Sequence, residues 1–374
     1  MTEIYLIRHA QAEGNLYRAM QGHWDGDVTA LGLREIDALA ERMRDVKIDA
    51  LYSSDLKRAM LTAGAIRRYH DLPLHTERDL REINVGPWEA RFFGDVSWEQ
   101  PEMMDTFIHR AEEFALDGAE RYDDVRRRAA AALTAIAEQN AGKVVAVVSH
   151  GVTIRCLLSY MLGKSLDDPT LPICGNTGLC HLFYENGRFR VDSVNDCKHL
   201  AALSLPDQRI RTNNLRGEFV DPVSAADYYR ASYADAWRST HGTLDGFDAE
   251  TYFAAACEHH GDDPEAIIRI FDAGKSAGLI DLDSRRGAHA GYGWISLLYL
   301  EEPYRGRELG VQLLGRALMH YSIMGRRSVR LQVAEDNTRA LRFYEKHGFR
   351  RLSYERGRFG KLYLMEYRFG ESHV

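Results

Sequence analysis

The sequence predicts an α/β protein made of two domains, on three observations. The 374 residues suffice for two separate hydrophobic cores. Strand-like and helix-like patterns alternate over residues 1–200, and another series of strands and helices begins after residue 217. A polar stretch with proline, asparagine and three arginines separates the two series. We therefore expect a domain at 1–205, a linker at 206–217 and a second domain at 218–374.

The first domain is expected to hold an open α/β sheet with helices on both faces, a three-layer α/β/α fold. Residues 144–148 are continuously apolar and rich in valine, which is typical of a parallel strand buried on both faces. Shorter apolar runs predict strands at 4–7 and 51–53, and alternation around Asn186-Gly187 predicts a hairpin over 181–194. Apolar residues recur at helical spacing over 33–43, 55–69 and 152–162.

Two histidines follow the carboxyl ends of predicted strands in this domain. His9 comes after the strand at 4–7, and His150 comes after the strand at 144–148. In an open α/β sheet, ligands bind outside the carboxyl ends of the strands. The topology can therefore bring the two imidazoles together at one edge of the sheet.

The second domain is expected to be a mixed α/β domain. Helices are predicted at 224–238, 248–260, 307–323 and 337–347. Strands are predicted at 266–272, 276–283, 291–300 and 328–334, with two more between 349 and 368.

The composition excludes several classes of partner. A formal net charge of −7 gives no general attraction to nucleic acid or to an anionic membrane. No apolar run reaches the roughly 18 residues of a membrane span, and the start lacks the basic segment of a signal peptide. Five cysteines are too few, and odd in number, for a disulfide scaffold, so we expect a cytoplasmic protein. Its partners are expected to be small molecules or peptides, and its oligomeric state is left open.

Four motifs in the first domain resemble those of the histidine phosphatase (phosphoglycerate-mutase-like) superfamily, in the family's order. They are LIRHAQAEGN at 6–15, SSDLKRA at 53–59, LREINVGPWE at 80–89 and VSHG at 148–151. Ala10 and Ala90 stand where the family usually has glycine. The resemblance covers residues 1–200 and implies hydrolysis of a small-molecule phosphoester through a phosphohistidine.

The residue types of these motifs fit phosphate chemistry. A phosphomonoester carries a charge of about −1.5 to −2 at neutral pH. Arg8 and Arg58 supply planar, permanently charged groups for its oxygens. The resemblance implies that His9 attacks phosphorus through a neutral ring nitrogen and that His150 hydrogen-bonds the transferring group. It further implies that Glu82 protonates the leaving group and then activates water.

Two points stay open in the first domain. Asn15 and Gln21 either contact the phosphate as well or are ordinary turn residues. A phosphomutase must shield its phosphohistidine from water, usually with a long covering insertion, whereas the segment 90–120 is modest and partly helical. We therefore expect hydrolysis rather than a mutase reaction. The cysteines and histidines between 174 and 199 lack the spacing of a zinc site, so no metal is expected.

A glycine-bearing turn in the second domain is suited to bind an anion. The turn RGRELG at 305–310 follows the strand at 291–300 and presents backbone N–H groups at a helix start. Together with VAEDNTRALRFYEKHGF at 333–349, it resembles the coenzyme A-binding core of the GNAT N-acetyltransferases. Glu308 replaces the first glycine of that family's turn motif. The resemblance implies acetyl-CoA as acyl donor and a small-molecule or peptide amine as acceptor.

The same resemblance assigns roles to individual residues. Tyr344 would protonate the leaving thiolate, and Asn337 would bond the pantetheine arm. Leu298 and Leu300 would offer backbone groups to that arm from a splayed strand. The turn residues expected to hold the coenzyme are Arg305, Gly306, Arg307, Leu309 and Gly310.

The acceptor side of the second domain is less defined. Glu301 and Glu302 are the nearest carboxylates for deprotonating an amine, and both are equally explained as solvated loop residues. Trp237, His241 and Tyr252 either line the acceptor side or belong to the core.

The sequence thus predicts a bifunctional enzyme that joins a phosphatase to an N-acetyltransferase. In the main alternative, only one domain is catalytic, and the other binds a ligand and regulates it. Glu308 makes the second domain the better candidate for that regulatory role.

Overall fold

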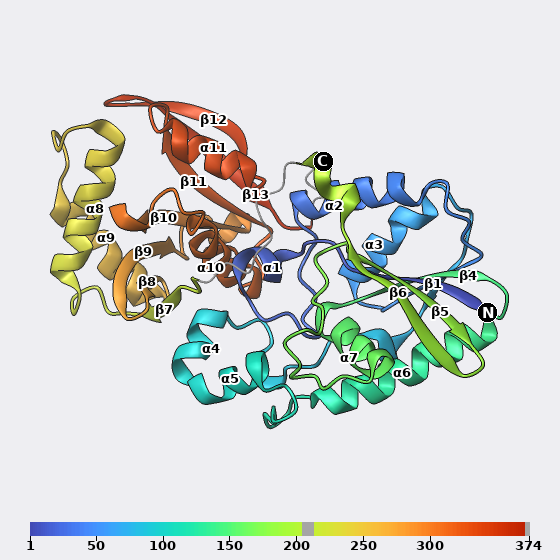
Figure 1. Cartoon of the computed structure of the whole chain (residues 1–374). Helices are drawn as coiled ribbons and strands as arrows, with labels where there is room; N and C mark the ends of the chain where they lie inside the picture. Colours follow the sequence, from blue (N-terminus) through green and yellow to red (C-terminus); the bar gives the residue numbers. More distant parts are fainter. Residues whose placement is uncertain (204–212, 371–374) are drawn as a thin grey trace. The chain divides into compact units, whose positions relative to one another are not determined.

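The computed structural model describes residues 1–203 and 213–370 (Figure 1). The chain divides into two compact units, Met1–Thr212 and Asn213–Val374, and each has its own sheet. Residues 206–212 of the predicted linker lie outside the described residues. Its last two residues, 216 and 217, belong instead to strand β7 (Arg216–Phe219). This strand is short, polar and at the edge of its sheet, so its sequence has no apolar alternation that would reveal it.

The first unit is built on a six-stranded sheet in the order β3-β2-β4-β1-β5-β6. Its strands are β1 (Thr2–Arg8), β2 (Ala50–Ser53), β3 (Leu74–Thr76), β4 (Val144–Ser149), β5 (Leu179–Glu185) and β6 (Arg188–Asp196). The first four are parallel, and the predicted hairpin β5–β6 continues the sheet antiparallel to β1. The register places Arg8 opposite Ser149. His9 and His150 therefore leave neighbouring strands at the same carboxyl edge.

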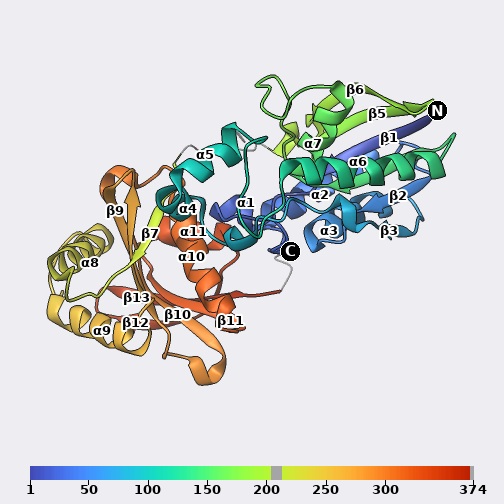
Figure 2. The same ribbon diagram turned by 90° about the horizontal axis from the view of Figure 1, so that it is seen from below.

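Helices cover both faces of this sheet, so the predicted three-layer fold is confirmed (Figure 2). The helices are α1 (Glu13–Tyr17), α2 (Ala30–Met43), α3 (Lys57–Arg67), α4 (Phe93–Glu99), α5 (Pro101–His109), α6 (Tyr122–Gln139) and α7 (Gly151–Leu162). Ala146 and Val148 of β4 pack with α2 and α3. Val145 and Val147 pack with α6 and α7 on the other face. Residues 144–148 of this strand are all apolar because both faces are buried.

The second unit has a seven-stranded sheet in the order β12-β13-β11-β10-β9-β8-β7. Besides β7, its strands are β8 (Ile267–Asp272), β9 (Lys275–Asp283), β10 (Tyr292–Leu300), β11 (Ser328–Ala334), β12 (Arg350–Gly357) and β13 (Gly360–Arg368). Neighbours are antiparallel except β10 and β11, which are parallel. Its helices are α8 (Ala226–His241), α9 (Ala249–Asp262), α10 (Gly310–Ile323) and α11 (Thr338–Lys346). The mixed α/β prediction for this half is confirmed.

Buried side chains of α10 fasten the start of the second unit. The Oε1 atom of Gln312 accepts a hydrogen bond from Leu215 N at 2.9 Å, and its Nε2 donates to Asn213 O at 2.9 Å. Arg316 donates to Leu215 O at 2.9 Å. These three bonds hold residues 213–215 against the helix that follows the glycine-bearing turn.

An ionic network joins α9 to β9. The imidazole of His259 lies with Nδ1 2.7 Å from Asp281 Oδ1 and Nε2 3.4 Å from Asp283 Oδ2, and Tyr229 donates to the other oxygen of Asp281. Burial by itself lowers the pKa of His259, but the hydrogen bond and charge of Asp281, with the charge of Asp283, outweigh it. The pKa of His259 is therefore raised above its ordinary value.

This raised pKa makes the stability of the second unit depend on pH. Protonated His259 contributes fully below the unfolded-state pKa of about 6.5, and the contribution is lost as the pH rises through the higher folded-state pKa. We expect His259→Gln to lower the free energy of unfolding more at about pH 6 than at about pH 9. Urea denaturation of both proteins over this range measures the difference. A loss that is independent of pH would show that His259 is neutral in the folded state.

Candidate active sites

His9, directly after β1, has the geometry of a nucleophile. Its side chain is 3% exposed, and Nδ1 lies 2.7 Å from the backbone oxygen of Ala10. A carbonyl oxygen can only accept, so Nδ1 carries the proton and Nε2 keeps its lone pair. Burial lowers the pKa of His9 well below its ordinary value, and the charges of Arg58 and Arg8 lower it further. The imidazole is therefore neutral at physiological pH, the form that can attack an electrophile.

His150, the N-cap residue of α7, lies beside His9. The two ring centroids are 5.1 Å apart. Neither ring nitrogen of His150 has a hydrogen-bond partner, although the residue is fully buried. Burial lowers the pKa of His150 as well, followed by the charges of Arg58 and His9. Because buried imidazoles normally find partners, these two nitrogens point to a polar ligand.

Two arginines hold positive charge around the histidine pair. Arg8 donates through Nη1 to Cys174 O at 2.6 Å. Arg58 is fully buried, donates through Nη2 to Gly22 O at 2.8 Å, and lies 3.3 Å from Asp25. The Nε atom of each arginine is buried without a partner. The backbone contacts fix both guanidinium groups and leave donors for an anion.

Gln21 and Asn15 have different surroundings. Both amide atoms of Gln21 are buried without a partner, and its backbone oxygen lies 3.4 Å from Arg58 Nη2. The side chain of Asn15 instead caps α1, because its Oδ1 accepts from Ala12 N at 3.0 Å. Asn176 Nδ2 lies 3.4 Å from the same oxygen. Contact of Asn15 or Gln21 with phosphate stays a prediction, and Gln21 has the surroundings that suit it.

Glu82 lies against the first turn of α7. Its Oε2 accepts from Val152 N at 3.1 Å, and its Oε1 accepts from Thr153 N at 3.0 Å and lies 3.2 Å from Thr153 Oγ1. The free N–H groups of the first turn of α7 thus hold both oxygens of this side chain in place. The same turn of α7 begins at the N-cap residue His150, so the candidate acid and the second histidine share one helix start.

A loop before β5 adds residues that the sequence analysis did not assign. Asn176 donates through Nδ2 to His9 O at 3.0 Å. Thr177 N donates to Arg8 O at 3.1 Å, and Cys174 O accepts from Arg8. Thr177 has a φ of 52°, in the left-handed region. The loop holds the backbone of the Arg8-His9 pair, and its only sequence signal is its place before a strand.

Polar atoms without partners are concentrated at this edge of the first sheet. In the described part of the chain they include Nε of Arg8 and Arg58, both nitrogens of His150 and both amide atoms of Gln21. An unsatisfied buried polar group costs about 1–3 kcal/mol. Their concentration beside a neutral His9 suits the binding of a small anion with several oxygens.

The turn before α10 in the second unit has an alternating backbone. Gly306 and Glu308 have positive φ values of 74° and 57°, and α10 begins without a side-chain cap. Alternation of right- and left-handed residues turns successive N–H groups toward one side, where an anion can bind. Arg305 is anchored, since its Nε donates to Leu300 O at 2.7 Å and its guanidinium pairs with Asp235.

The other residues of this turn differ in exposure to solvent. Arg307 is exposed, whereas Leu309 is 4% exposed and precedes the helix as its N-cap residue. Gly310 begins α10 beside Phe343, whose ring lies 3.4 Å from the position that a Cβ would take. Arg307 makes a long hydrogen bond of 3.5 Å to Pro303 O and lies over the ring of Tyr304, while Leu309 and Gly310 set the position of the turn.

Strands β10 and β11 separate next to this turn. Their parallel ladder ends at Trp294 and Arg330, although both strands continue for several residues. Ser296 is an extra residue in β10 at the register shift relative to β9. Leu298 and Leu300 lie beyond this bulge, in the part of β10 that pairs with β9. A splayed strand of this kind leaves backbone groups for a ligand.

Helix α11 carries the remaining candidates of the second unit. Tyr344 is 9% exposed, its ring lies 5.3 Å from that of Phe349, and burial raises its pKa above the ordinary value. Asn337 is the N-cap residue, with Oδ1 accepting from Ala340 N at 3.1 Å and Nδ2 donating to Thr240 Oγ1 at 3.2 Å. Its contact with a pantetheine arm stays a prediction, since both ends of its amide have protein partners.

Trp237, His241 and Tyr252 belong to a half-buried aromatic cluster with Phe247 and Phe359. The ring of His241 lies 4.6 Å from Trp237 and 4.7 Å from Phe359, and Tyr252 lies 5.6 Å from Phe247. Trp237 Nε1 and His241 Nδ1 are buried without partners. The cluster joins α8 and α9 to the turn between β12 and β13. Of the two nearby acidic candidates, Glu301 accepts from Tyr228 at 2.8 Å and Glu302 is exposed.

Comparison with protein families identifies both halves. The model of the histidine phosphatase superfamily (branch 1) matches residues 4–197, just over half of the chain. The chain belongs to the histidine phosphatase superfamily. The model of the acetyltransferase (GNAT) family matches residues 226–349. A GNAT domain therefore follows the histidine phosphatase domain, and both expectations of family are confirmed.

Known relatives align with the histidine phosphatase domain. A probable phosphoglycerate mutase, GpmB, of Yersinia pestis (strain Pestoides F) is 30% identical over 205 residues, which are 54% of this chain and 95% of the relative. The solved structure of YhfR from Bacillus stearothermophilus is 30% identical, with a TM-score of 0.52, and covers 54% of this chain and 100% of its own. A mycobacterial glucosyl-3-phosphoglycerate phosphatase, Rv2419c, with VO3 is 26% identical, with a TM-score of 0.49, over 52% of this chain and 98% of its own.

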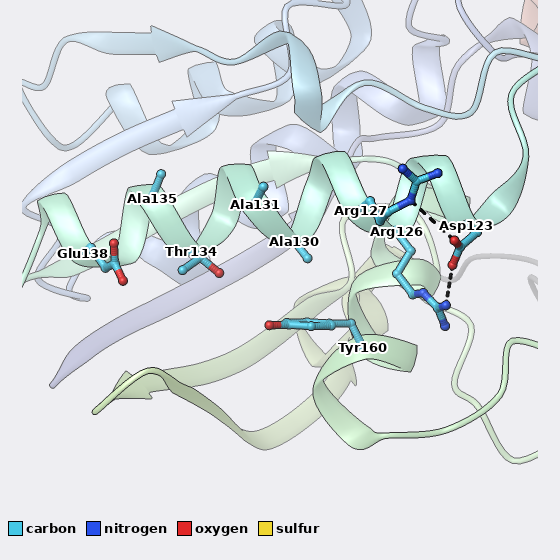
Figure 3. A pocket seen from close by; sticks show the side chains of 9 residues that line it. All are labelled: Asp123, Arg126, Arg127, Ala130, Ala131, Thr134, Ala135, Glu138 and Tyr160. Carbon is cyan, nitrogen blue, oxygen red and sulfur yellow. Dashed lines mark hydrogen bonds and ion pairs between the residues drawn. The ribbon is translucent and has the colours of Figure 1, made fainter.

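A surface groove of the histidine phosphatase domain lies between α6 and α7 (Figure 3). The residues that line it are Asp123, Arg126, Arg127, Ala130, Ala131, Thr134, Ala135, Glu138 and Tyr160. It contains none of the predicted site residues. Asp123 pairs there with Arg126 and Arg127, so the charges on this face of α6 neutralise one another.

The cysteines and histidines near β5 are held in separate contacts. Cys174 and Cys180 have their sulfur atoms 3.3 Å apart, whereas His181 bonds two carboxylates and His199 bonds Thr177 Oγ1 at 3.0 Å. Over residues 1–203 and 213–370, no group of three or more His, Cys, Asp or Glu side chains is placed to hold a metal ion.

None of the helices in the described ranges combines the length and apolar character needed to cross a bilayer.

Proposed function

We propose that the histidine phosphatase domain hydrolyses phosphomonoesters through a phosphohistidine, and that the GNAT domain transfers acetyl groups from acetyl-CoA to an amine. The first reaction is supported above all by the unpartnered polar atoms around the neutral His9. The second is supported by the splayed β10 beside the alternating turn at Gly306.

In the first half-reaction, Nε2 of His9 attacks phosphorus and the bond to the leaving oxygen breaks. Arg8 and Arg58 donate to the phosphoryl oxygens, over which the transition-state charge is spread. His150 hydrogen-bonds the same group through a ring nitrogen. Glu82 gives its proton to the leaving oxygen, so the product departs as a neutral alcohol.

In the second half-reaction, the Glu82 carboxylate takes a proton from water as the water oxygen attacks phosphorus. The bond between phosphorus and His9 breaks, and inorganic phosphate is released. His9 is again neutral, and Glu82 is again protonated for the next cycle. One carboxyl group thus acts first as acid and then as base.

Transfer of the phosphoryl group to another alcohol is the alternative, because one relative is a probable phosphoglycerate mutase. We favour hydrolysis, since the segment 90–120 forms only two short helices, α4 and α5. Incubation with a panel of phosphomonoesters, including 3-phosphoglycerate, separates the two reactions. A phosphatase releases inorganic phosphate, whereas a mutase forms an isomer and releases little.

Replacing Glu82 with glutamine is expected to slow hydrolysis by about 10²–10⁴-fold for esters with poor leaving groups. Glutamine keeps the size and an accepting oxygen but cannot supply the proton. An activated ester such as p-nitrophenyl phosphate needs no protonation and should lose far less. Glu82 also activates water in the second half-reaction, which all esters share. The rate of phenol release in the first turnover, compared along aryl phosphates with graded leaving groups, therefore measures this dependence. Equal losses along the series would remove Glu82 from the role of general acid.

For acetyl transfer, the turn at Gly306 and the backbone of β10 would hold acetyl-CoA, which supplies an activated acetyl group. An amine nitrogen attacks the thioester carbon, the carbon–sulfur bond breaks, and the proton that the nitrogen loses passes to solvent, from which Tyr344 is later reprotonated. The proton for the departing sulfur comes from Tyr344, whose raised pKa keeps its hydroxyl protonated at neutral pH. The aromatic cluster around Trp237 is the proposed acceptor side. A panel of amines with acetyl-CoA, followed by thiol release, tests the activity.

Glu308 is expected to weaken the binding of acetyl-CoA. It occupies a left-handed conformation where the family motif has glycine, and its carboxylate lies 3.6 Å from Lys346 Nζ, which only partly offsets its charge. Glu308→Gly removes the carboxylate, and with it the repulsion between this charge and a bound pyrophosphate. We expect the Kd for acetyl-CoA to fall by about threefold or more.

Isothermal titration with acetyl-CoA measures this change. Glu308→Gln separates the charge from the backbone effect, and Glu302→Gln, at an exposed carboxylate nearby, is the matched control. Weaker binding of acetyl-CoA by Glu308→Gly would show that the carboxylate stabilises the conformation of the turn and does not repel the ligand.

The competing proposal keeps one domain as a ligand-binding regulator. Two independent enzymes predict that a substitution in one active site leaves the other activity unchanged. A regulator predicts instead that acetyl-CoA changes the rate of phosphate release. Assays of phosphate release with and without acetyl-CoA, and of acetyl transfer with and without phosphomonoesters, distinguish the two.

A further inference from the structure

Arg128 on α6 binds both the segment that carries Glu82 and the side chain of Glu120. Its Nη1 donates to Asp79 O at 2.7 Å and to Arg81 O at 2.8 Å, and its Nη2 donates to Glu82 O at 3.0 Å. Its remaining N–H groups bind Glu120, from Nε to Oε1 at 2.8 Å and from Nη2 to Oε2 at 2.9 Å. A guanidinium has five N–H donors, and all five are occupied.

Glu120 extends this contact to the other side of Glu82. Its Oε2 also accepts from Asn84 N at 2.8 Å. Burial raises the pKa of Glu120, but the hydrogen bonds from Arg128 and Asn84 outweigh it and lower the pKa, so the carboxylate is ionised at neutral pH. Arg128 and Glu120 therefore form an ion pair that hydrogen-bonds the backbone on both sides of Glu82.

The segment 79–84, which Arg128 and Glu120 bind, has little regular secondary structure. Only residues 78–80 form a turn of 3-10 helix, and the chain then runs without strand or helix to residue 85. The backbone of Glu82 is held by Arg128 and by His23 Nε2 at 3.0 Å, while its carboxylate is held by α7. The position of the carboxylate thus depends on two separate supports.

We propose that Arg128 and Glu120 are a positioning pair that fixes Glu82 for proton transfer to the leaving group. This inference rests on the proposed role of Glu82 as general acid. Neither residue of the pair is assigned to contact the phosphate. Loss of the contacts between Arg128 and Glu120 should shift the carboxyl group of Glu82 slightly. A small shift is enough to slow proton transfer from Glu82 to the leaving oxygen, because this step depends on the distance between the two atoms.

The test compares Arg128→Lys with the wild-type enzyme on aryl phosphates of graded leaving ability. Lysine keeps the charge but has three donors from a single nitrogen, so it cannot reproduce the five contacts. We expect the first-turnover rate of phenol release from phenyl phosphate to fall by about tenfold or more, with less change in KM and with the first-turnover rate for p-nitrophenyl phosphate lowered by less than about threefold. Glu120→Gln should show the same selectivity more weakly, because one accepting oxygen remains.

Arg127→Lys is the matched control. Arg127 is the preceding residue of α6 and pairs with acidic residues on the exposed face, as shown for Asp123 in Figure 3. Its substitution should leave all rates unchanged. Equal loss of the first-turnover rate on every ester by a folded Arg128→Lys protein would reduce Arg128 to a general structural role and overturn the proposal, as would no loss at all. Should Arg128→Lys fail to fold, Glu120→Gln decides by the same criterion.

A double substitution separates failure of this inference from failure of the proposed mechanism. If Arg128 acts through Glu82, adding Arg128→Lys to Glu82→Gln should cause little further loss on phenyl phosphate. Losses that multiply would overturn the positioning role while leaving Glu82 as the acid. If Glu82→Gln itself shows no dependence on the leaving group, the general-acid assignment fails, and the positioning role fails with it.

Discussion

Replacing His9 with alanine is expected to abolish phosphate release, with a loss of at least about 10⁴-fold, as in enzymes that lose a catalytic histidine or nucleophile. The reason is its geometry. Nδ1 is committed to Ala10 O, and Nε2 is the only ring atom left to attack phosphorus. Neither Arg8 nor His150 can replace it, because one is permanently charged and the other is held on a different strand end. Release of inorganic phosphate from the best ester of the panel measures the loss.

The covalent intermediate provides a second measurement of the same prediction. Enzyme quenched during turnover should carry one phosphoryl group on His9, and the adduct should be labile in acid. His109→Ala, at an exposed histidine of α5, should retain full turnover and the adduct. An acid-stable adduct, or one on another residue by mass spectrometry, would show that His9 is not the nucleophile. Acetyl transfer should be the same in wild type and His9→Ala if the domains work independently.

Replacing Tyr344 with phenylalanine is expected to lower acetyl transfer by about 10²–10⁴-fold, the usual effect of losing a general acid. Phenylalanine preserves the ring that packs against Phe349, so the fold and the affinity for coenzyme A should change little. The raised pKa caused by burial makes the hydroxyl a proton donor rather than an anion at neutral pH. Thiol release at saturating acetyl-CoA and amine measures the rate.

Tyr354→Phe, at an exposed tyrosine of β12, is the matched control for this substitution. It should retain the wild-type rate. An unchanged rate in Tyr344→Phe, measured where chemistry limits turnover, would assign the hydroxyl to packing alone. Phosphate release by the histidine phosphatase domain should be unaffected in either variant.

The elements that carry the first site could be predicted from the sequence because their signals are local. The apolar run at 144–148 indicates a strand buried on both faces, and a histidine directly after it must lie at the carboxyl edge. The same argument places His9. The structure adds the register that sets these two strand ends side by side. It also gives the tautomer of His9, which depends on one backbone oxygen.

Contacts between a side chain and a distant backbone segment could not be predicted in the same way. Arg126, Arg127 and Arg128 are consecutive and chemically identical, yet only Arg128 reaches residues 79–82. The rotation of α6 against the sheet decides which arginine turns inward, and it is set by packing over the whole helix. The contacts of the loop at 174–177 could not be predicted for a similar reason, because they join it to Arg8 and His9 through backbone atoms and through the side chain of Asn176.

In the second unit, the turn and helix motifs predicted where a coenzyme would bind, but not how the side chains are engaged. Asn337 appears in the motif, and the structure uses it to cap α11. Arg305 also appears, and its guanidinium holds Leu300 O and Asp235. Motif residues of this kind maintain the shape of a site as well as touching its ligand, and the motif alone does not distinguish the two uses.

The bonds from α10 to residues 213–215 determine where the protein can be divided. A fragment that begins at 218, directly after the predicted linker, would lose half of β7 and remove the backbone partners that residues 213–215 offer to the amide of Gln312 and the guanidinium of Arg316. Each orphaned group costs about 1–3 kcal/mol, a large share of the stability of a small domain. We therefore expect the second unit to fold on its own only when it keeps Asn213, so that a cut placed before that residue preserves the helix on which its proposed coenzyme site is built.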